Sequence, residues 1–448
     1  MEDGERITNQ PTVAIATLGC KLNQAESEEL ARRFNDAGYC VVQFDESADV
    51  YVVNTCSVTH IADRKSRQLI RQARRANPGG IVVATGCYAE VAPQEVGRVD
   101  RVDLVVRNED KGRIVEMVDE RRMRRPPGQV GGLGVQLPSA TSRTRALLKI
   151  QEGCNKFCAY CMVPLARGRE RSRPASEVIA DVNRLVAEGR KEVVLTGVNI
   201  GAYGRDSSGE PPLLDLVRRI LDETQLPRLR LSSIEPEDFD PRIVSLMDGG
   251  RLARHLHLPL QSGSDQVLRL MRRRYSSQWF LSLVDEIRRA VPPVAITTDV
   301  IVGFPGEGEA EFHETCDLVR KARFAGIHVF KYSARRGTRA AQMPNQVPYT
   351  VKQQRSEALL QLGAKLGRSY REGFAGETLE VLYEEVASAE RMPLGGRATT
   401  RIWEGLTDNY IRVFTPSERP LGNQIVPTRM IGEHPNGLWG SIESSELR

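Results

Sequence analysis

Two sets of three cysteines are the residues of this sequence best suited to chemistry. The first set is Cys154, Cys158 and Cys161, spaced C-x3-C-x2-C within GCNKFCAYCMVP. Three thiolates on one short loop can ligate three irons of a cubic iron–sulfur cluster and leave the fourth iron open. An open iron can chelate S-adenosylmethionine (SAM), and electron transfer then cleaves its sulfonium to a 5′-deoxyadenosyl radical. The spacing therefore predicts a [4Fe–4S] cluster that binds SAM.

A structural zinc site is the alternative for this loop. Tetrahedral zinc takes four protein ligands, and no further Cys or His lies close by in the sequence to complete such a site. The three cysteines also stand beside Gly153 and Asn155, which are typical of a loop and not of a packed core. We therefore favour the cluster, and we name these three cysteines the loop trio.

The second set is Cys20, Cys56 and Cys87, which we name the edge trio. Each ends a short apolar run of the kind that forms a buried strand: IATLGC, VVNTC and VATGC. In a parallel sheet the carboxyl ends of the strands share one edge, where ligands bind in open α/β folds. A free cysteine is most often a buried core residue, but that reading does not explain why all three hold the same strand position. The pattern predicts a second iron–sulfur cluster on the edge trio.

The elements that position these cysteines indicate an α/β protein with three parts. Strands alternate with helical patterns in the N-terminal part, which predicts βαβ units and a parallel sheet. Six further strands with intervening helices predict a partial, TIM-like (β/α)6 barrel with its active site at the carboxyl ends of the strands. Short strands broken by turn residues predict a small all-β barrel at the C-terminus. The expected boundaries are 10–125 for the sheet domain, 126–142 for a Gly- and Pro-rich linker, 143–372 for the barrel and 373–443 for the tail.

Composition excludes several other classes of protein. The chain has 448 residues, of which 40% are hydrophobic and 27% are charged, a profile typical of globular domains. No apolar stretch approaches the ~18–20 residues that a membrane span needs, and the polar start MEDGERITNQ is unlike a secretory signal. Eight cysteines are too few for a disulfide scaffold of this length. We therefore expect a cytoplasmic protein that does not enter a membrane.

Basic residues are unevenly distributed along the chain. The segment 373–448 holds 7 arginines and no lysine against 11 acids, a net charge of −4, which leaves +9 on the rest. Arginines cluster at three places: Arg64, Arg67, Arg71, Arg74 and Arg75 on one helical stripe; Arg167, Arg169, Arg171 and Arg173; and Arg269, Arg272, Arg273 and Arg274. One such cluster is usually a solvated face. Three of them favour a nucleic acid bound at the catalytic mouth.

Two further residues are candidates for cofactor binding. Gly197, in the glycine-rich turn TGVNIGAYG, suits a close approach of the backbone to a small ligand. Glu235 ends the third barrel strand, where a carboxylate can hold a ribose hydroxyl; a helix cap or a salt bridge explains it equally well. His255 and His257 alternate along a strand and so share one face, for which packing or hydrogen bonding is favoured over metal ligation.

A series of motifs runs along most of the chain: TLGCKLNQAESE, NTCSVT, ATGCYAE, GCNKFCAYCMVP, RGRERSR, LTGVNIGAYG, LPLQSGSDQVLRLMRRRY, TDVIVGFPGE and YSARRGTRAA. With these motifs the whole chain resembles the radical-SAM methylthiotransferases, which have an N-terminal cluster domain, a radical-SAM domain and a C-terminal TRAM domain. The branches of this family differ in substrate. The branch that modifies N6-threonylcarbamoyladenosine is the most similar at three places: the residues after Cys20 (KLNQ), those after Cys56 (SVT) and the segment DRKSRQ at 63–68.

This resemblance implies a transferase that adds a methylthio group to C2 of N6-threonylcarbamoyladenosine next to the tRNA anticodon. One SAM would methylate sulfur held at the edge trio, and a second SAM, at the loop trio, would give the radical that attacks C2. The implied cofactors are two [4Fe–4S] clusters and SAM, with no catalytic residue beyond the cluster ligands. The implied partners are a tRNA anticodon stem-loop, an electron donor such as flavodoxin or ferredoxin, and a sulfur donor.

Other functions stay open at this point. One is methylthiolation of isopentenyladenosine in tRNA, and another is methylthiolation of a ribosomal-protein aspartate. A third is an iron–sulfur RNA-binding protein without catalysis, in which the clusters are structural.

Overall fold

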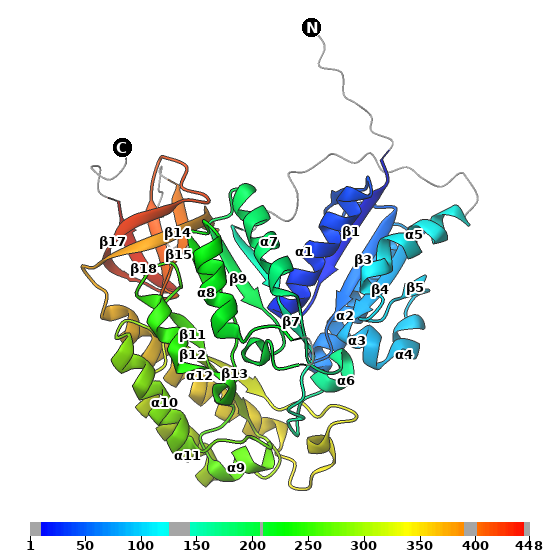
Figure 1. Cartoon of the computed structure of the whole chain (residues 1–448). Helices are drawn as coiled ribbons and strands as arrows, with labels where there is room; N and C mark the ends of the chain where they lie inside the picture. Colours follow the sequence, from blue (N-terminus) through cyan, green and yellow to red (C-terminus); the bar gives the residue numbers. More distant parts are fainter. Residues whose placement is uncertain (1–9, 125–143, 207–208, 389–400, 443–448) are drawn as a thin grey trace. The chain divides into compact units, whose positions relative to one another are not determined.

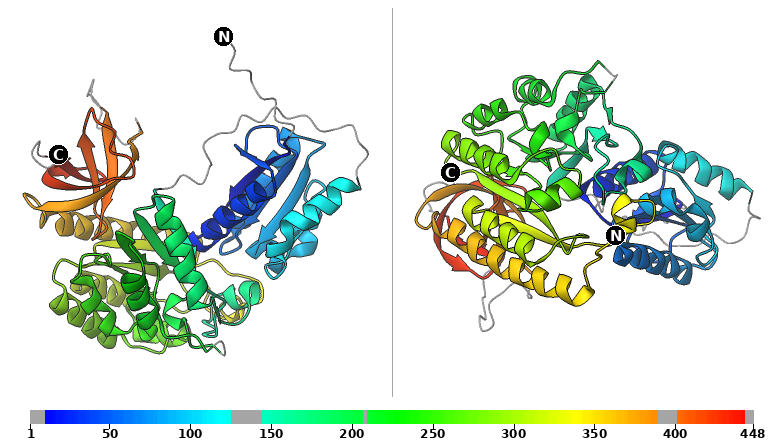
Figure 2. Two further views of the ribbon diagram at one scale, coloured as in Figure 1. Left: turned by 45° about the horizontal axis from the view of Figure 1, so that its top comes forward. Right: turned by 90° about the horizontal axis from the view of Figure 1, so that it is seen from below.

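The computed structural model describes residues 10–124, 144–206, 209–388 and 401–442, and its contacts divide the chain into two compact units (Figures 1 and 2). The first unit joins Met1–Arg143 with Glu152–Arg169 and Ser333–Ala341, and the second holds the remainder. The loop trio belongs to the first unit in this division. The predicted boundaries stay predictions, and the predicted linker lies outside the described residues.

The first unit is built on a five-stranded parallel sheet in the order β2-β1-β3-β4-β5 (Figure 1). Helices α1 and α5 pack on one face, and α2 and α4 pack on the other. Strands covered on both faces are largely apolar, and β3 and β4 are buried along their whole length. The strands are β1 (Thr12–Thr17), β2 (Cys40–Val42), β3 (Val50–Thr55), β4 (Ile81–Gly86) and β5 (Leu104–Val105). The helices are α1 (Lys21–Asp36), α2 (His60–Ala76), α3 (Cys87–Val91), α4 (Pro93–Gly97), η1 (Lys111–Arg113), α5 (Ile114–Met123) and α6 (Val163–Arg167).

The second unit contains the six predicted barrel strands in chain order. They form the parallel sheets β6-β9-β10 and β11-β12-β13, and a bridge between Ser233 and His257 joins the two. This arrangement confirms the partial (β/α)6 barrel. Its strands are β6 (Arg145–Lys149), β9 (Glu192–Thr196), β10 (Arg228–Leu231), β11 (His255–His257), β12 (Ala295–Val302) and β13 (Gly326–Lys331). The covering helices are α7 (Ala175–Ala187), α8 (Leu213–Glu223), α9 (Asp265–Leu270), α10 (Ser277–Ala290), α11 (Glu309–Ala322) and α12 (Tyr349–Glu372).

Short elements complete the connections around these strands. Two strands have only two residues each, β7 (Gln151–Glu152) and β8 (Arg171–Ser172). The 3-10 helices are η2 (Ile200–Ala202), η3 (Pro236–Asp238), η4 (Pro241–Met247) and η5 (Arg339–Gln342). In the part of the chain that the structure describes, none of the helices combines the length and the apolar character that a membrane span requires.

The C-terminal part of the second unit is a small closed β-barrel, as predicted, with strand order β14-β15-β16-β18-β17. Closure leaves no exposed sheet edge. Its interior holds apolar side chains such as Val381, Val413 and Leu438. The strands are β14 (Thr378–Val386), β15 (Ile402–Thr407), β16 (Arg412–Pro416), β17 (Ile425–His434) and β18 (Gly437–Ser441).

Buried charges join the small barrel to the large one within this unit. Arg230 on β10 bonds Glu192 on β9 at 2.7 Å and donates to the carbonyl oxygens of Thr407 and Asp408, both at 3.0 Å. Arg254 adds an ion pair to Asp408 at 2.5 Å. Burying these charges is tolerated because they are paired and hydrogen-bonded. The β15–β16 turn is therefore fixed near the amino ends of β9 and β11, opposite the carboxyl ends that form the active face of such barrels.

Candidate functional site

The edge trio lies along one edge of the parallel sheet of the first unit. Strands β1, β3 and β4 are direct neighbours, and each leads into one of the cysteines. Cys20 caps α1 three residues after β1, Cys56 directly follows β3, and Cys87 directly follows β4 as the first residue of α3. The sheet thus brings the three thiols to the same carboxyl edge, as the sequence predicted.

Glycines allow the chain to turn tightly beside these thiols. Gly19 has φ +105°, and a Cβ there would lie 2.8 Å from the Sγ of Cys56. Gly86 has φ +90°, and a Cβ there would collide with the backbone of Thr55. Only glycine suits such a backbone at such close approach. Asn23 also holds the end of β3 in place, because its Nδ2 donates to the carbonyl oxygen of Thr55 at 3.0 Å.

The surroundings of the edge trio keep Cys56 protonated in the absence of a metal. Burial, with a smaller contribution from the negative charges of Cys87 and Cys20, raises the pKa of Cys56 to about 11. Thiols must lose their protons to ligate a metal, so the positive charge of a bound metal is what would favour three thiolates here. The donor set and its position fit an iron–sulfur cluster.

A buried arginine supplies positive charge beside this edge. The side chain of Arg167 is 2% exposed and bonds Glu26 at 2.7 Å, Glu152 at 3.0 Å and Asn23 at 2.5 Å. Although burial opposes its charge, the carboxylate of Glu26 and the thiols of Cys87 and Cys20 hold the pKa of Arg167 well above its usual value. The sequence grouped this arginine with a cluster facing a polyanion. Its guanidinium is instead bound inside the first unit.

A second buried arginine, which sequence reasoning missed, reaches the residue after Cys56. Arg335 donates from Nη2 to the Ser57 hydroxyl and to the carboxylate of Asp63, both at 2.7 Å. Ser57 in turn donates to Asp63 at 2.7 Å. The sequence pointed to these three residues only through the family resemblance, because Ser57, Asp63 and Arg335 lie in the motifs NTCSVT, DRKSRQ and YSARRGTRAA, respectively.

The loop trio is held by backbone hydrogen bonds within the first unit. The amide of Lys156 donates to the sulfur of Cys154 at 3.5 Å, and the amide of Val163 donates to the sulfur of Cys161 at 3.4 Å. N–H···S bonds of this kind stabilise thiolates and tune iron–sulfur clusters. All three sulfurs belong to half-buried residues, so a ligand can reach them. This loop also fits a cluster.

Further contacts tie the loop trio to the N-terminal sheet. Helix α6, which begins just after Cys161, packs against α3, which begins at Cys87. The side chain of Asn108 donates to the carbonyl oxygen of Ala166 at 2.6 Å. Both trios therefore belong to one compact unit, although 67 residues separate Cys87 from Cys154 in the chain.

The two other candidate residues have protein partners. A Cβ on Gly197 would lie 2.9 Å from the carbonyl oxygen of Gln151, so this glycine accommodates a neighbouring strand. Glu235 forms an ion pair with the buried Arg273, which is the salt-bridge alternative that the sequence left open. Arg273, like Arg167, is thereby not available to a polyanion. Cofactor binding by Gly197 and Glu235 stays a prediction.

The predicted arginine stripe on α2 is only partly free to meet a ligand. Arg67 donates to the hydroxyl of Tyr88 at 2.7 Å, and Arg74 pairs with Asp103 at 2.7 Å. The exposed members are Arg64, Arg71 and Arg75. Outside α2, the arginines of the predicted clusters that are exposed are Arg169, Arg171, Arg269, Arg272 and Arg274.

Comparison with known proteins supports this reading of the fold. Residues 12–107 match an uncharacterized protein family, UPF0004, and residues 148–319 match the Radical SAM superfamily. The chain is 40% identical to the threonylcarbamoyladenosine tRNA methylthiotransferase MtaB of Bacillus subtilis, over 94% of each chain. It is 36% identical to the tRNA-2-methylthio-N(6)-dimethylallyladenosine synthase of Moorella thermoacetica, over 94% of this chain and 95% of the relative.

A solved structure shares the fold at low sequence identity. The radical S-adenosylmethionine methyltransferase TsrM of Kitasatospora setae, with cobalamin and a [4Fe–4S] cluster bound, has a TM-score of 0.52 and 15% identity. The match covers 72% of this chain and 75% of that chain.

The superfamily match and the partial barrel define the class: this is a radical-SAM enzyme. The relatives narrow the assignment, because they are tRNA methylthiotransferases matched over nearly their whole length. The chain belongs to the radical-SAM tRNA methylthiotransferase family. It is a transferase of tRNA modification, and its cofactors are SAM and [4Fe–4S] clusters.

Proposed function

We propose that this enzyme adds a methylthio group to C2 of N6-threonylcarbamoyladenosine next to the anticodon of tRNA. The 40% identity to a relative named for that substrate supports it, as do the residues KLNQ after Cys20. The relative named for dimethylallyladenosine is 36% identical, so isopentenyladenosine is the second candidate substrate.

The proposal assigns one cluster to each cysteine trio. The observation that carries it is that both trios belong to a single compact unit, in which backbone amides donate to two sulfurs of the loop trio. The bound cofactors would supply reductive cleavage of SAM to a radical and a place for the sulfur that is transferred. A radical is needed because the aromatic C2–H of adenosine has no usable acidity for a general base.

The chain's own residues hold and balance these groups. The amides of Lys156 and Val163 would stabilise the thiolates of the loop trio. Arg167 and Arg335 would balance negative charge beside the edge trio, because both are buried and lie close to its cysteines or their neighbours. Gly197 and Glu235 remain our candidates for contacts with SAM.

The tRNA partner would be bound through exposed basic residues. Arg64, Arg71 and Arg75 on α2 and Arg169 after the loop trio face solvent and can meet phosphates. The target base must leave the stack of the anticodon loop to reach a radical, as in other base-modifying enzymes. We further propose an electron donor such as flavodoxin or ferredoxin, a separate sulfur donor, and a cytoplasmic site of action, where tRNA is modified.

Mass spectrometry of tRNA nucleosides from a deletion strain tests the substrate. Loss of 2-methylthio-N6-threonylcarbamoyladenosine, restored by the wild-type gene and not by Cys56→Ala, is the expected result. Loss of the methylthio form of isopentenyladenosine instead would favour the second substrate. Loss of a methylthio-aspartate peptide from a ribosomal protein, or no change in any methylthio product, would contradict the proposal.

A further inference from the structure

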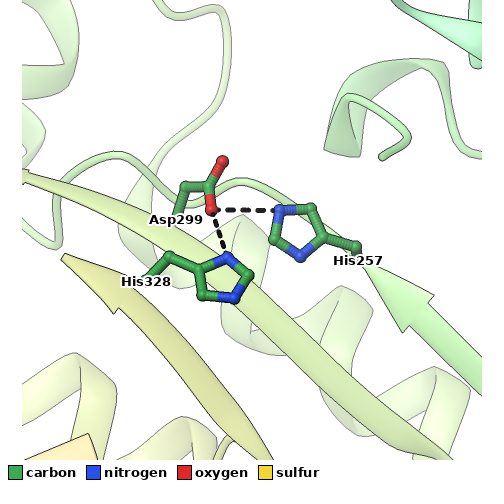
Figure 3. Close-up of side chains that lie close together, drawn as sticks. All are labelled: His257, Asp299 and His328. Atoms are coloured by element: carbon green, nitrogen blue, oxygen red, sulfur yellow. Dashed lines mark hydrogen bonds and ion pairs between the residues drawn. The ribbon is translucent and has the colours of Figure 1, made fainter. Parts of the chain in front are cut away.

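Three potential metal ligands meet on the barrel strands of the second unit, to which none of the six cysteines of the two trios belongs. His257 ends β11, Asp299 lies on β12 and His328 lies on β13, and their side chains point toward one another (Figure 3). One ligand atom from each residue lies within 4.8 Å of the others. Neither the family models nor the sequence motifs assign these residues a role together.

The strand register explains why the three side chains converge. Asp299 is paired with His328 across β12 and β13, and His257 is paired with Thr297 across β11 and β12. Side chains two residues apart on a strand share a face, so Asp299 stands beside Thr297 and between the two histidines. Ligands carried on three adjacent strands are held more firmly than ligands on loops.

Both histidines have a ring nitrogen close to the same carboxylate oxygen of Asp299. His257 Nε2 lies 3.2 Å from Asp299 Oδ1, and His328 Nδ1 lies 3.1 Å from it. Ligand atoms bound at about 2.0–2.2 Å to one ion are spaced by about this distance.

A hydroxyl on β12 can orient the buried histidine for metal binding. Thr297 Oγ1 lies 2.9 Å from His257 Nδ1 and 2.9 Å from His255 Nε2. A hydroxyl can accept a hydrogen bond from one ring and donate to the other. When His257 donates from Nδ1, its Nε2 directs a lone pair at the Asp299 oxygen, and a cation between them would stabilise both. Histidine ligands in metal sites are commonly fixed by such a bond on their other nitrogen.

The exposure of the three side chains leaves one side of the group open. His257 is 9% exposed, Asp299 is 24% exposed and His328 is 61% exposed. We propose that His257, Asp299 and His328 bind one divalent metal ion of the zinc type, with the remaining positions open to water or a ligand. Two histidines and one carboxylate are a usual donor set for such ions.

Element-specific analysis of the reconstituted enzyme tests this site separately from the clusters. The wild-type protein, loaded anaerobically with its clusters, is incubated with Zn²⁺, desalted and measured for zinc and iron in the same sample. We expect about one zinc per chain, and we expect His328→Ala and Asp299→Asn to lose it with unchanged iron content. His313→Ala is the matched control, because His313 is exposed to a similar extent but lies on α11 outside the group.

A competing chelator gives a second readout. Zinc affinity measured against a chromophoric chelator should fall at least tenfold in His328→Ala and stay unchanged in His313→Ala. Equal zinc content and equal affinity in wild type and His328→Ala would overturn the proposal. So would a wild-type protein that retains no zinc, since the group would then be a hydrogen-bonded triad only.

Discussion

Replacing Arg167 by Met should destabilise the first unit far more than any change at its exposed neighbour Arg169. The Arg167 guanidinium bonds two carboxylates and the Asn23 side chain while fully buried. Methionine keeps much of the volume and removes all of these bonds. Arg169, by contrast, is exposed and has its guanidinium 4.8 Å from the centre of the partly exposed Phe157 ring.

The structure sets the size of the expected effect. Breaking a buried ion pair from one side costs about 3–5 kcal/mol, because the other charge is left buried. Glu26 keeps one partner, Lys111, at 2.6 Å, which favours the lower part of that range, about 3–4 kcal/mol. Losing the contact of Arg169 with Phe157 should cost about 0.5–1 kcal/mol.

Thermal unfolding of the metal-free variants, followed by circular dichroism, measures the difference. For a domain of this size, about 3–4 kcal/mol lowers the midpoint by roughly 6–16 °C, and Arg169→Ala should shift it by only a few degrees. Arg167→Lys should recover part of the lost stability, because the lysine ammonium keeps the positive charge but lacks the planar guanidinium that bonds both carboxylates. A midpoint for Arg167→Met close to that of Arg169→Ala would refute the reasoning.

Three further outcomes follow from the site. Full reconstitution should give about eight irons per chain. Changing all three loop-trio cysteines to Ala should halve the iron content and abolish SAM cleavage, and full iron content in that variant would show that the ligand assignment is wrong. Gly153 and Gly168 both have positive φ, +74° and +69°, so Ala is strained at either position. Only a Cβ on Gly153 would also overlap the backbone of Arg169, so Gly153→Ala should lower iron loading more than Gly168→Ala does; equal loading would contradict this. In the metal-free folded protein the pKa of Cys56 is about 11, against an ordinary value of 9.0, so the free energy of unfolding should fall as the pH rises between these two values. Iodoacetamide at pH 8 should modify the exposed Cys20 first, and faster labelling of Cys56 would contradict the burial argument.

The cysteine geometry could be predicted because it depends on local patterns. Each edge-trio cysteine ends a β-branched run, and parallel topology alone brings such ends to one edge. The six barrel strands and the small C-terminal barrel follow from the same kind of periodicity. These features need no knowledge of which residues meet across the fold.

The buried charges could not be predicted, because their partners lie far away in the chain. Arg167 meets Glu26 across 141 residues, and Arg335 meets Asp63 across 272 residues. Arginines are usually exposed, so the sequence assigned Arg167 and Arg273 to a surface for a polyanion, and the structure corrects both. His255 and His257 do hydrogen-bond, through Thr297, as the sequence favoured, and the metal ligation that we propose for His257 goes beyond that preference. The contribution of His328 depends on strand register, which the sequence did not reveal.

One anaerobic assay tests the central claim, that radical generation and sulfur transfer depend on different cysteine trios. The enzyme is incubated with SAM, a reductant and tRNA bearing N6-threonylcarbamoyladenosine, and 5′-deoxyadenosine and the 2-methylthio nucleoside are measured in the same sample. The account predicts both products from the wild type, and from Cys56→Ala it predicts 5′-deoxyadenosine without the methylthio nucleoside. Methylthiolation by Cys56→Ala, or none by a wild-type enzyme with full iron content, would contradict it.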